Sequence, residues 1–275
     1  MTNLITIEKT KSNRTFGIEI EMYSRTSANT VASLISQAGV PCNSQSYNHH
    51  TSRAWKIVSD GSLNNAPRDH IYAMEIVSPI LRGEEGLRQI RVICAVINDS
   101  AVDAQVNKTC GLHVHHGAGD FGRQQFKNLF NLYKKYEDEL DELVAPSRRG
   151  DNAYYCRGLQ NKNLNDLYCS RYNKLNLCSF ERHGTVEIRH FNGSTDAAKI
   201  CGWVVLTQAI VDRAVELKAI RSGRCAQFNL FRAVGLYKWN AEDRATTEEE
   251  KNEFKAQYTS IRKWVTSRKR QLASA

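Results

Sequence analysis

The stretch TFGIEIEMYS, residues 15 to 24, places two glutamates two positions apart in an otherwise apolar run. Strict alternation predicts a half-buried strand whose apolar face carries Phe16, Ile18, Ile20 and Met22. Glu19 and Glu21 then share the other face, about 6.5 Å apart. Two ionised carboxylates in this position repel each other unless water screens them or a cation joins them. The stretch alone leaves a solvated outer face and a cation site open.

Three further apolar runs carry ionisable groups with the same period of two. Glu75 lies within AMEIVSP, where a carboxylate is costly unless it is paired or bound to metal. In CGLHVHHG, His113 and His115 share one face, and in TVEIRHF, Glu187 and Arg189 do the same. Four predicted strands thus carry acid, imidazole or guanidinium groups, which is hard to explain as four unrelated solvated faces.

If these faces converge, their carboxylates and imidazoles can hold a pair of divalent cations. The oxygen-rich set favours Mg²⁺, or Mn²⁺, over zinc. Arg189 would suit a phosphoryl oxygen that develops negative charge. Structural alternatives stay open: His115 as a satisfied core histidine, His116 and His190 as structural or surface residues, and Glu187 with Arg189 as an ion pair.

The elements that must position these groups alternate irregularly between strands and helices. Strands are predicted at 14–23, 55–59, 71–77, 111–116, 174–180 and 184–191. Helices are predicted at 28–38, 84–98 and 123–144, and another from Thr195 to about Arg221. The order indicates an α+β fold, and no repeat or linker divides the chain. The tail from Phe254 to Ala275 is basic and amphipathic, which is typical of a docked terminal helix and less often of a nucleic-acid contact.

Composition narrows the class of protein. The 275 residues carry a formal net charge of +9, which suggests an acidic partner. The eight cysteines are scattered without a C-x-x-C pair, and neither a secretory segment nor a membrane span is evident. We therefore expect a cytoplasmic protein with no membrane partner.

Five motifs in order, FGIEIE, DGSL, MEIVSP, CGLHVHHG and GTVEIRHF, resemble the putative amidoligase family, carboxylate-amine ligases related to glutamine synthetase and glutamate–cysteine ligase. The resemblance covers roughly residues 14 to 215. It implies a curved antiparallel sheet, backed by helices as in the glutamine synthetase catalytic domain, whose concave face holds Mg·ATP. It also divides the chain into a catalytic domain, 1–221, and a helical basic extension packed on it, 222–275.

The resemblance implies two cations. Glu21 and Glu75 would share one of them, while Glu19, His113 and Glu187 would hold the other. Metal ligation would also make Glu75 part of the catalytic machinery.

The resemblance further implies that Arg189 stabilises the transferring phosphoryl group and that His115 lines the pocket near the accepting carboxylate. Arg171 and Asn176 in SRYNKLNL, with Arg148 and Arg149 in PSRRGDN, would bind the nucleotide phosphates or contact the substrate carboxylate. A basic loop is the alternative for the PSRRGDN pair. Asp60 and Ser62 of DGSL would supply a further ligand or form a plain turn.

The implied activity is ATP- and Mg²⁺-dependent formation of an amide or isopeptide bond through an acyl phosphate. Its substrates would be a carboxylate and an amine, for example peptide or cell-wall related. A metal-dependent hydrolase using the same Glu and His cluster is one alternative. A basic nucleic-acid-binding protein without catalysis is the other.

Overall fold

A seven-stranded open sheet forms the centre of the computed structural model, which describes residues 4–48, 50–151, 153–220, 230–234 and 247–274. The strand order is β2-β3-β4-β1-β5-β7-β6. The strands are β1 (Phe16–Ser24), β2 (Cys42–Ser44), β3 (Trp55–Ser59), β4 (Tyr72–Val77), β5 (Gly111–Gly117), β6 (Leu175–Asn176) and β7 (Thr185–Asn192). Neighbours run antiparallel except β2 and β3, which run parallel. The predicted α+β class is confirmed, with a mixed sheet in place of a purely antiparallel one.

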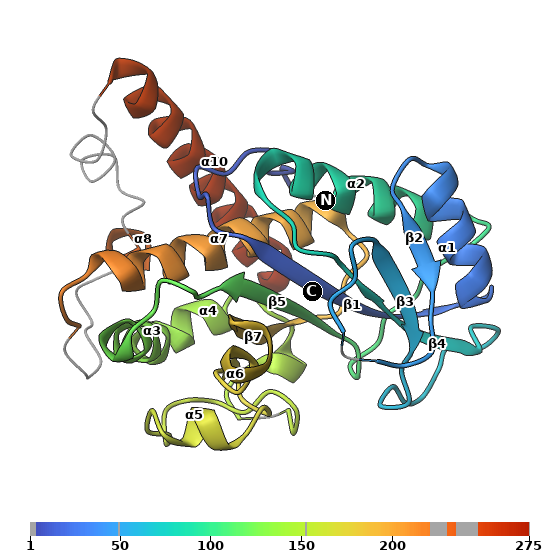
Figure 1. Ribbon diagram of the computed structural model, residues 1–275, viewed down its shortest axis with the longest axis horizontal. Coiled ribbons are helices and arrows are strands. Elements are labelled where there is room, and N and C mark those ends of the chain that lie inside the picture. The colour runs from blue at the N-terminus through green and yellow to red at the C-terminus, as the bar shows by residue number, and fades with distance from the viewer. Residues whose placement is uncertain (1–3, 49, 152, 221–229, 235–246, 275) are drawn as a thin grey trace.

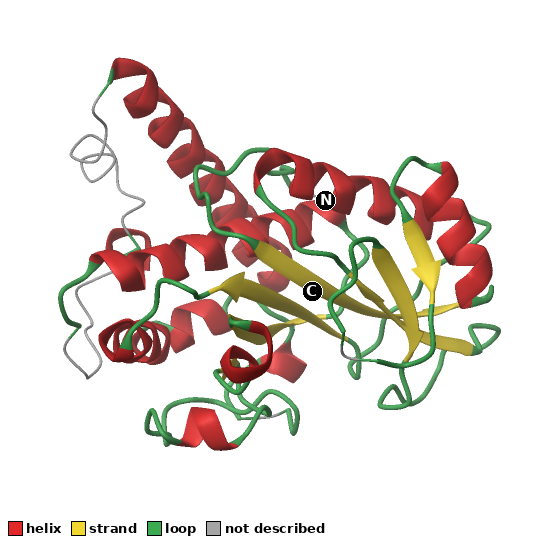
Figure 2. Cartoon of the chain, viewed as in Figure 1, coloured by secondary structure: helices red, strands yellow, loops and turns green. Residues whose placement is uncertain are grey.

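Helices cover the sheet, as Figures 1 and 2 show. In the described residues they are α1 (Ala28–Gln37), α2 (Gly83–Ile97), α3 (Arg123–Lys135), α4 (Glu137–Asp141), a 3₁₀ turn (Pro146–Arg148), α5 (Asp166–Cys169), α6 (Ser179–His183), α7 (Ala197–Glu216), α8 (Leu230–Ala233) and α10 (Glu248–Ala273). The long helices α2 and α7 lie along one side of the sheet with α1, and the short helices α5 and α6 lie on the other (Figure 1). The site described below lies on this second side.

Alternation along β1 produces the two faces. Phe16, Ile18, Ile20 and Met22 are at most 2% exposed and pack into the main core. Helix α2 approaches this face closely at Gly86, where a Cβ atom would lie 2.7 Å from Phe16 Cζ. Only glycine leaves room for this close packing of α2 on β1. Helix α2 therefore covers the apolar face of the sheet, and the face that carries Glu19 is turned away from it.

Two predicted elements differ from the structure near the site. The strand predicted at 174–180 is limited to Leu175–Asn176, because the Asn176 side chain accepts a hydrogen bond from Cys178 N at 2.8 Å and the chain turns into α6. The helix predicted at 123–144 is interrupted at Tyr136. Immediately after this break, the buried Glu137 carboxylate accepts a hydrogen bond from Leu159 N at 3.0 Å.

The two long C-terminal helices pack on each other. Helix α7 begins one residue after Asp196, whose side chain accepts hydrogen bonds from Ala198 N and Lys199 N, and it ends at Glu216, before the predicted end near Arg221. Helix α10 docks on it through Trp264, whose indole Nε1 donates to Ala198 O at 2.7 Å. The division at residue 221 stays a prediction, and residues 222–229 and 235–246 lie outside the described residues. Within the described chain, no helix is long and apolar enough to span a membrane.

Candidate active site

Three cross-strand pairs gather six ionisable side chains on the face of the sheet turned away from α2. Directly paired residues on neighbouring strands point to the same face, with their Cβ atoms about 5 Å apart. The pairs are Glu21 with Glu75, Glu19 with His113, and His115 with Glu187. The four strands predicted to converge are therefore adjacent, with β1 and β5 at the centre.

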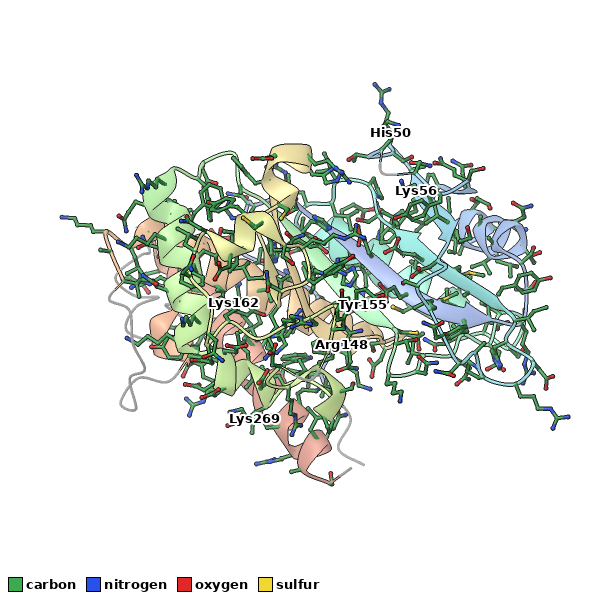
Figure 3. All side chains as sticks on the ribbon, turned by 90° about the horizontal axis from the view of Figure 1, so that it is seen from below. His50, Lys56, Arg148, Tyr155, Lys162 and Lys269 are labelled. Carbon is green, nitrogen blue, oxygen red and sulfur yellow. The ribbon has the colours of Figure 1, made fainter. Side chains whose placement is uncertain are left out.

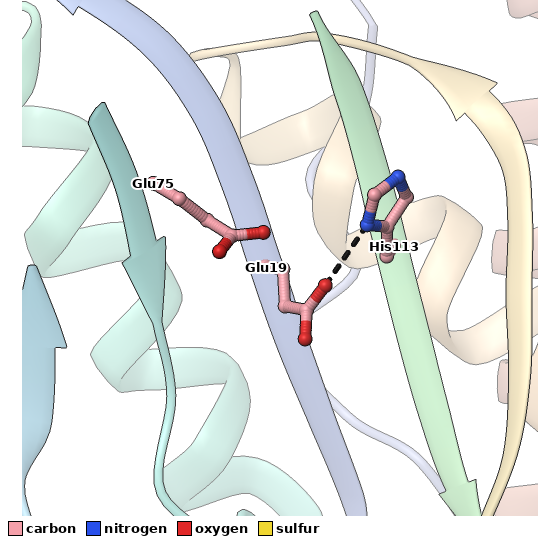
Figure 4. A group of neighbouring side chains, drawn as sticks. All are labelled: Glu19, Glu75 and His113. Atoms are coloured by element: carbon pink, nitrogen blue, oxygen red, sulfur yellow. Dashed lines mark hydrogen bonds and ion pairs between the residues drawn. The ribbon is translucent and has the colours of Figure 1, made fainter. Parts of the chain in front are cut away.

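The first group consists of Glu19, Glu75 and His113, drawn in Figure 4. They come from β1, β4 and β5, and one ligand atom of each lies within 4.8 Å of the others. His113 Nδ1 and Glu19 Oε2 are 2.9 Å apart. Two carboxylates and an imidazole at this separation can share a divalent cation.

The second group consists of Glu19, His115 and Glu187, again within 4.8 Å. His115 Nδ1 lies 3.0 Å from Thr185 Oγ1, while His115 Nε2 is buried and has no hydrogen-bond partner among the described residues. That nitrogen lies 3.3 Å from Glu19 Oε1 and 4.0 Å from Glu187 Oε1. A histidine ligand usually donates its other ring N–H to an oxygen, as Thr185 permits, so this arrangement suits metal ligation.

The pKa values of Glu75 and Glu19 are shifted in opposite directions. Burial raises the pKa of Glu75 well above its ordinary value, and the charges of Glu19 and Glu21 raise it further. Burial also opposes ionisation of Glu19, but the hydrogen bond with His113 and the nearby imidazole of His115 hold its pKa well below the ordinary value. The face therefore concentrates more negative charge than its own cations balance, which favours a bound cation.

Glu21 is held differently from the other acids. Its Oε2 accepts a hydrogen bond from Gly111 N at 2.6 Å, and its Oε1 lies 3.5 Å from His113 Nε2. Although Glu21 faces Glu75 across the strands, the two groups of ligand atoms described above contain Glu19 with Glu75 and Glu187 with His115, and neither contains Glu21. The predicted division of ligands between two cations stays a prediction.

Arg189 and Asn176 surround Glu187. Arg189 Nη1 donates to Glu187 Oε1 and Asn176 Nδ2 donates to Glu187 Oε2, each at 2.5 Å. Burial alone would raise the pKa of Glu187, but the charges of Arg189 and then His115 favour its ionised form, so its pKa is lowered from the ordinary value. Arg189 also donates through Nε to Tyr155 O at 3.4 Å, so its guanidinium spans the space between the sheet and the loop that follows the 3₁₀ turn.

A pocket of about 570 Å³ covers this face. Most of the predicted site residues line it: Glu19, Glu21, Glu75, His113, His115, Arg171, Asn176, Glu187 and Arg189. Asp60 and Ser62 also line it, while Ser62 N donates to Asp60 Oδ1 at 2.8 Å, so the DGSL segment is both a turn and part of the wall. A second pocket of about 740 Å³, between the N-terminal segment, α7 and α10, contains none of the ionisable groups described above.

The structure does not bring Arg148 and Arg149 to the lining of this pocket. Arg148 is 5% exposed and donates through Nη2 to Cys110 O at 2.8 Å. Arg149 donates through Nε to Val144 O at 3.0 Å. Both guanidinium groups therefore bind backbone carbonyls near the start of β5 and the end of α4.

Sequence reasoning overlooked Lys56, a buried cation on the wall of the pocket. Its Nζ donates to Asn48 O, Asn48 Oδ1 and His50 O at 2.8 to 3.0 Å, which fastens the loop after β2 over the sheet; Figure 3 labels Lys56 and His50. The signal was present, because a lysine between Trp55 and Ile57 is as costly in an apolar strand as Glu75.

Helix α6 contributes a second overlooked set, Arg182 and His183, both on the pocket wall. The His183 ring packs edge-on against His115, with centroids 6.1 Å apart. Their signal in the sequence is weak, since SFERHG resembles any exposed helix end. Only the return of the chain to β7 brings α6 over the sheet.

The donor set fits divalent metal ions. Carboxylate oxygens with imidazole nitrogen suit Mg²⁺ or Mn²⁺, and the orphaned Nε2 of His115 is an available ligand. Arg189 stands beside them as a fixed cation for an anionic group. The arrangement can bind a metal-complexed anion and stabilise negative charge that develops on it.

Comparison with known proteins identifies one family. A sequence model described as putative amidoligase enzyme matches residues 12–169 and 158–211, well over half of the chain. A search of the curated proteins finds no match. One solved structure, "Crystal structure of novel glutamine synthase homolog", is 13% identical over 95% of this chain and 67% of that chain, with a TM-score of 0.46. This likeness is too weak to support a conclusion.

Proposed function

The chain belongs to the putative amidoligase family, which indicates a ligase-type enzyme with carboxylate and amine substrates, and on this premise we propose that it is an ATP- and Mg²⁺-dependent ligase. It joins a carboxylate to an amine through an acyl phosphate. One observation carries the proposal: two groups of potential metal ligands share Glu19, and Arg189 lies beside them in the same pocket.

Divalent cations would be held by Glu19, Glu21, Glu75, His113, His115 and Glu187, and would neutralise charge on the phosphates of ATP. The protein's own groups then orient the reactants. Arg189 donates to the transferring phosphoryl group, where negative charge develops. Asn176 fixes one oxygen of Glu187 and Thr185 fixes the ring of His115, so each ligand is held by a second hydrogen bond.

The proposed reaction has two steps. An oxygen of the substrate carboxylate bonds to the γ-phosphorus as the bond to the β-γ bridging oxygen breaks, and ADP leaves. The amine nitrogen then bonds to the acyl carbon, the acyl–oxygen bond breaks, and phosphate leaves together with one proton from the amine. Pre-positioning of both substrates in the pocket supplies much of the acceleration.

A basic group on the pocket wall suggests the character of the carboxylate substrate. Arg182 of α6 lies on the wall and forms no part of the acidic cluster. It favours an acidic acceptor, such as a peptide or cell-wall fragment with more than one carboxylate. Since ATP is the proposed co-substrate and the seven described cysteines are free, we place the reaction in the cytoplasm.

The first test is the thermal midpoint with ATP, in the presence and absence of Mg²⁺. A ligand that binds only the folded state raises the midpoint, so we expect Mg·ATP to stabilise the wild type and Glu75→Gln to lose this response. Glu181→Gln is the matched control, because Glu181 is exposed on α6 and does not line the pocket.

A second test detects the acyl phosphate directly. Hydroxylamine added with ATP, Mg²⁺ and a panel of acidic peptides should be converted to a hydroxamate, with one ADP formed per hydroxamate. A thermal midpoint that rises with Mg²⁺ but not with ATP would instead favour the metal-dependent hydrolase. Salt-dependent DNA or RNA binding that Glu75→Gln leaves intact would favour a nucleic-acid-binding protein.

A further inference from the structure

Three tyrosine rings cluster on the surface next to the pocket. The ring centroids of Tyr154, Tyr155 and Tyr172 are 5.0 to 5.5 Å apart, close enough for all three to contact one another. Tyr154 is 60% exposed and Tyr155 47% exposed. We call these three rings the tyrosine platform; Figure 3 labels Tyr155.

The tyrosine platform is held by backbone hydrogen bonds. Arg157 N donates to Tyr172 O at 2.8 Å and Lys174 N donates to Arg157 O at 3.0 Å, which ties the two loop segments together. The Arg157 guanidinium lies over the Tyr154 ring, 5.1 Å from its centroid. The ammonium of Lys174, in the same loop segment as Tyr172, is buried and paired with Asp141 at 2.6 Å. The two loop segments that carry the exposed rings are therefore held side by side.

Two arginines connect the platform to the candidate active site. Arg171 lines the pocket, and its guanidinium lies over Tyr172 at 5.3 Å from the ring centroid. Arg189 also lines the pocket and donates to Tyr155 O. Carboxylates that can hold metal, then guanidinium groups, then aromatic rings thus follow one another from the sheet outward.

We propose that the tyrosine platform stacks the base of the nucleotide. The inference rests on the proposed function, because the nucleotide's phosphates must lie at the metal ligands and Arg189. A ligand with negative charge at one end and a planar ring at the other matches this order of groups. Tyrosine and guanidinium planes stack on bases, and stacking tolerates any base because each has a π face.

The test compares binding of Mg·ATP with binding of Mg·tripolyphosphate, which lacks base and ribose, by titration calorimetry. We expect the wild type to prefer Mg·ATP. Tyr154→Ala and Tyr172→Ala should each weaken Mg·ATP binding about fivefold to a hundredfold and leave Mg·tripolyphosphate binding unchanged. Tyr172→Phe should restore most of the affinity, because stacking needs the ring and not the hydroxyl.

Tyr168→Ala is the matched control, since Tyr168 is 39% exposed but its ring contacts Phe126 instead of the platform. Equal wild-type affinity for the two ligands, or alanine variants that bind Mg·ATP normally, would overturn the stacking site while leaving the proposed ligase intact. A wild type that binds neither ligand would overturn both proposals. Equal losses for both ligands in the tyrosine variants would also overturn the stacking role.

Discussion

Two clusters of ionisable residues lie on opposite faces of β7 and differ in charge balance. On the pocket face, Glu187 belongs to a set in which acidic groups exceed fixed cations. On the other face, His190 Nε2 lies 2.6 Å from Asp141 Oδ1, and Lys174 Nζ bonds to both Asp141 and Glu137. In the second cluster, which we call the buried network, the lysine bridges the two carboxylates.

The difference shows how a site can be distinguished from a structural ion network. In the buried network, Tyr133 O–H can donate to His190 Nδ1, and neutral His190 can donate to Asp141, so the histidine is satisfied without a ligand. On the pocket face, His115 Nε2 lies near two carboxylates but has no hydrogen-bond partner among the described residues, and Glu75 resists ionisation. An unbalanced cluster at a pocket is a candidate site, while a balanced and closed one supports the fold.

The largest expected effect comes from unbalancing the buried network. Lys174→Met removes the ammonium that bridges Glu137 and Asp141 and leaves their buried charges without this cation, so we expect a loss of about 3–5 kcal/mol in the free energy of unfolding. Urea denaturation measures this loss. Lys199→Met, at a partly exposed pair with Asp196, should change stability by less than about 0.5 kcal/mol. A loss below about 1 kcal/mol at Lys174 would refute the structural role of the network.

A pH titration probes the same network through His190. Burial lowers the pKa of His190 from 6.5 to about 4, so between these values the unfolded chain binds a proton that the folded protein does not. Stability should therefore fall as pH decreases from about 6.5 to about 4, by about 3 kcal/mol from this residue.

The contribution of His190 can be isolated by substitution. Buried His116, with its pKa lowered to about 3, acts in the same direction, so wild type alone does not separate the two. His190→Gln should flatten the pH dependence of unfolding by urea relative to the wild type. Parallel curves for the two proteins would show that His190 titrates normally in the fold.

Substitution on the pocket face should not reduce stability, in contrast to substitution in the buried network. Glu75→Gln relieves repulsion among carboxylates, so without metal we expect equal or greater stability than the wild type. With Mg·ATP at a hundred times its Kd, the wild type should gain about 2.7 kcal/mol and the variant should not. Differential scanning calorimetry under both conditions measures this. A destabilised metal-free variant would place Glu75 in the structural class with Glu137.

A smaller effect is expected from Thr185, which positions His115. Thr185→Val removes the hydroxyl at Nδ1 and should weaken Mn²⁺ binding by roughly 10- to 100-fold, with little change in unfolding. Titration calorimetry with Mn²⁺ measures the affinity. Thr185→Ser, which keeps the hydroxyl, should bind normally. Unchanged binding by the valine variant would show that His115 is not oriented as a ligand.

The smallest effect is expected at Arg149. Its guanidinium bonds to Val144 O away from the pocket, so Arg149→Gln should alter Mg·ATP affinity by less than about 0.5 kcal/mol. Arg171→Gln, on the pocket wall, should weaken Mg·ATP binding clearly. Titration calorimetry on both variants measures their affinity for Mg·ATP. A clear loss of affinity in Arg149→Gln would support the predicted role of Arg149 as a nucleotide ligand.

The local character of each site strand could be predicted from the sequence alone. Alternation has a period of two, so it assigns Glu19 and Glu21 to one face without knowledge of any partner strand. The cost of burying a carboxylate marked Glu75 in the same way. Five ordered motifs then indicated the family, which the family match from residue 12 to residue 211 confirms.

The tertiary structure decided which of these groups meet and which are satisfied elsewhere. Strand register places Glu21 opposite Glu75, and packing turns the Arg148 guanidinium to Cys110 O, outside the pocket lining. The buried network and the tyrosine platform also join residues distant in sequence, as Lys174 with Glu137 shows. Local propensity acts within a few residues, whereas register, burial and hydrogen-bond partners depend on the whole packed chain.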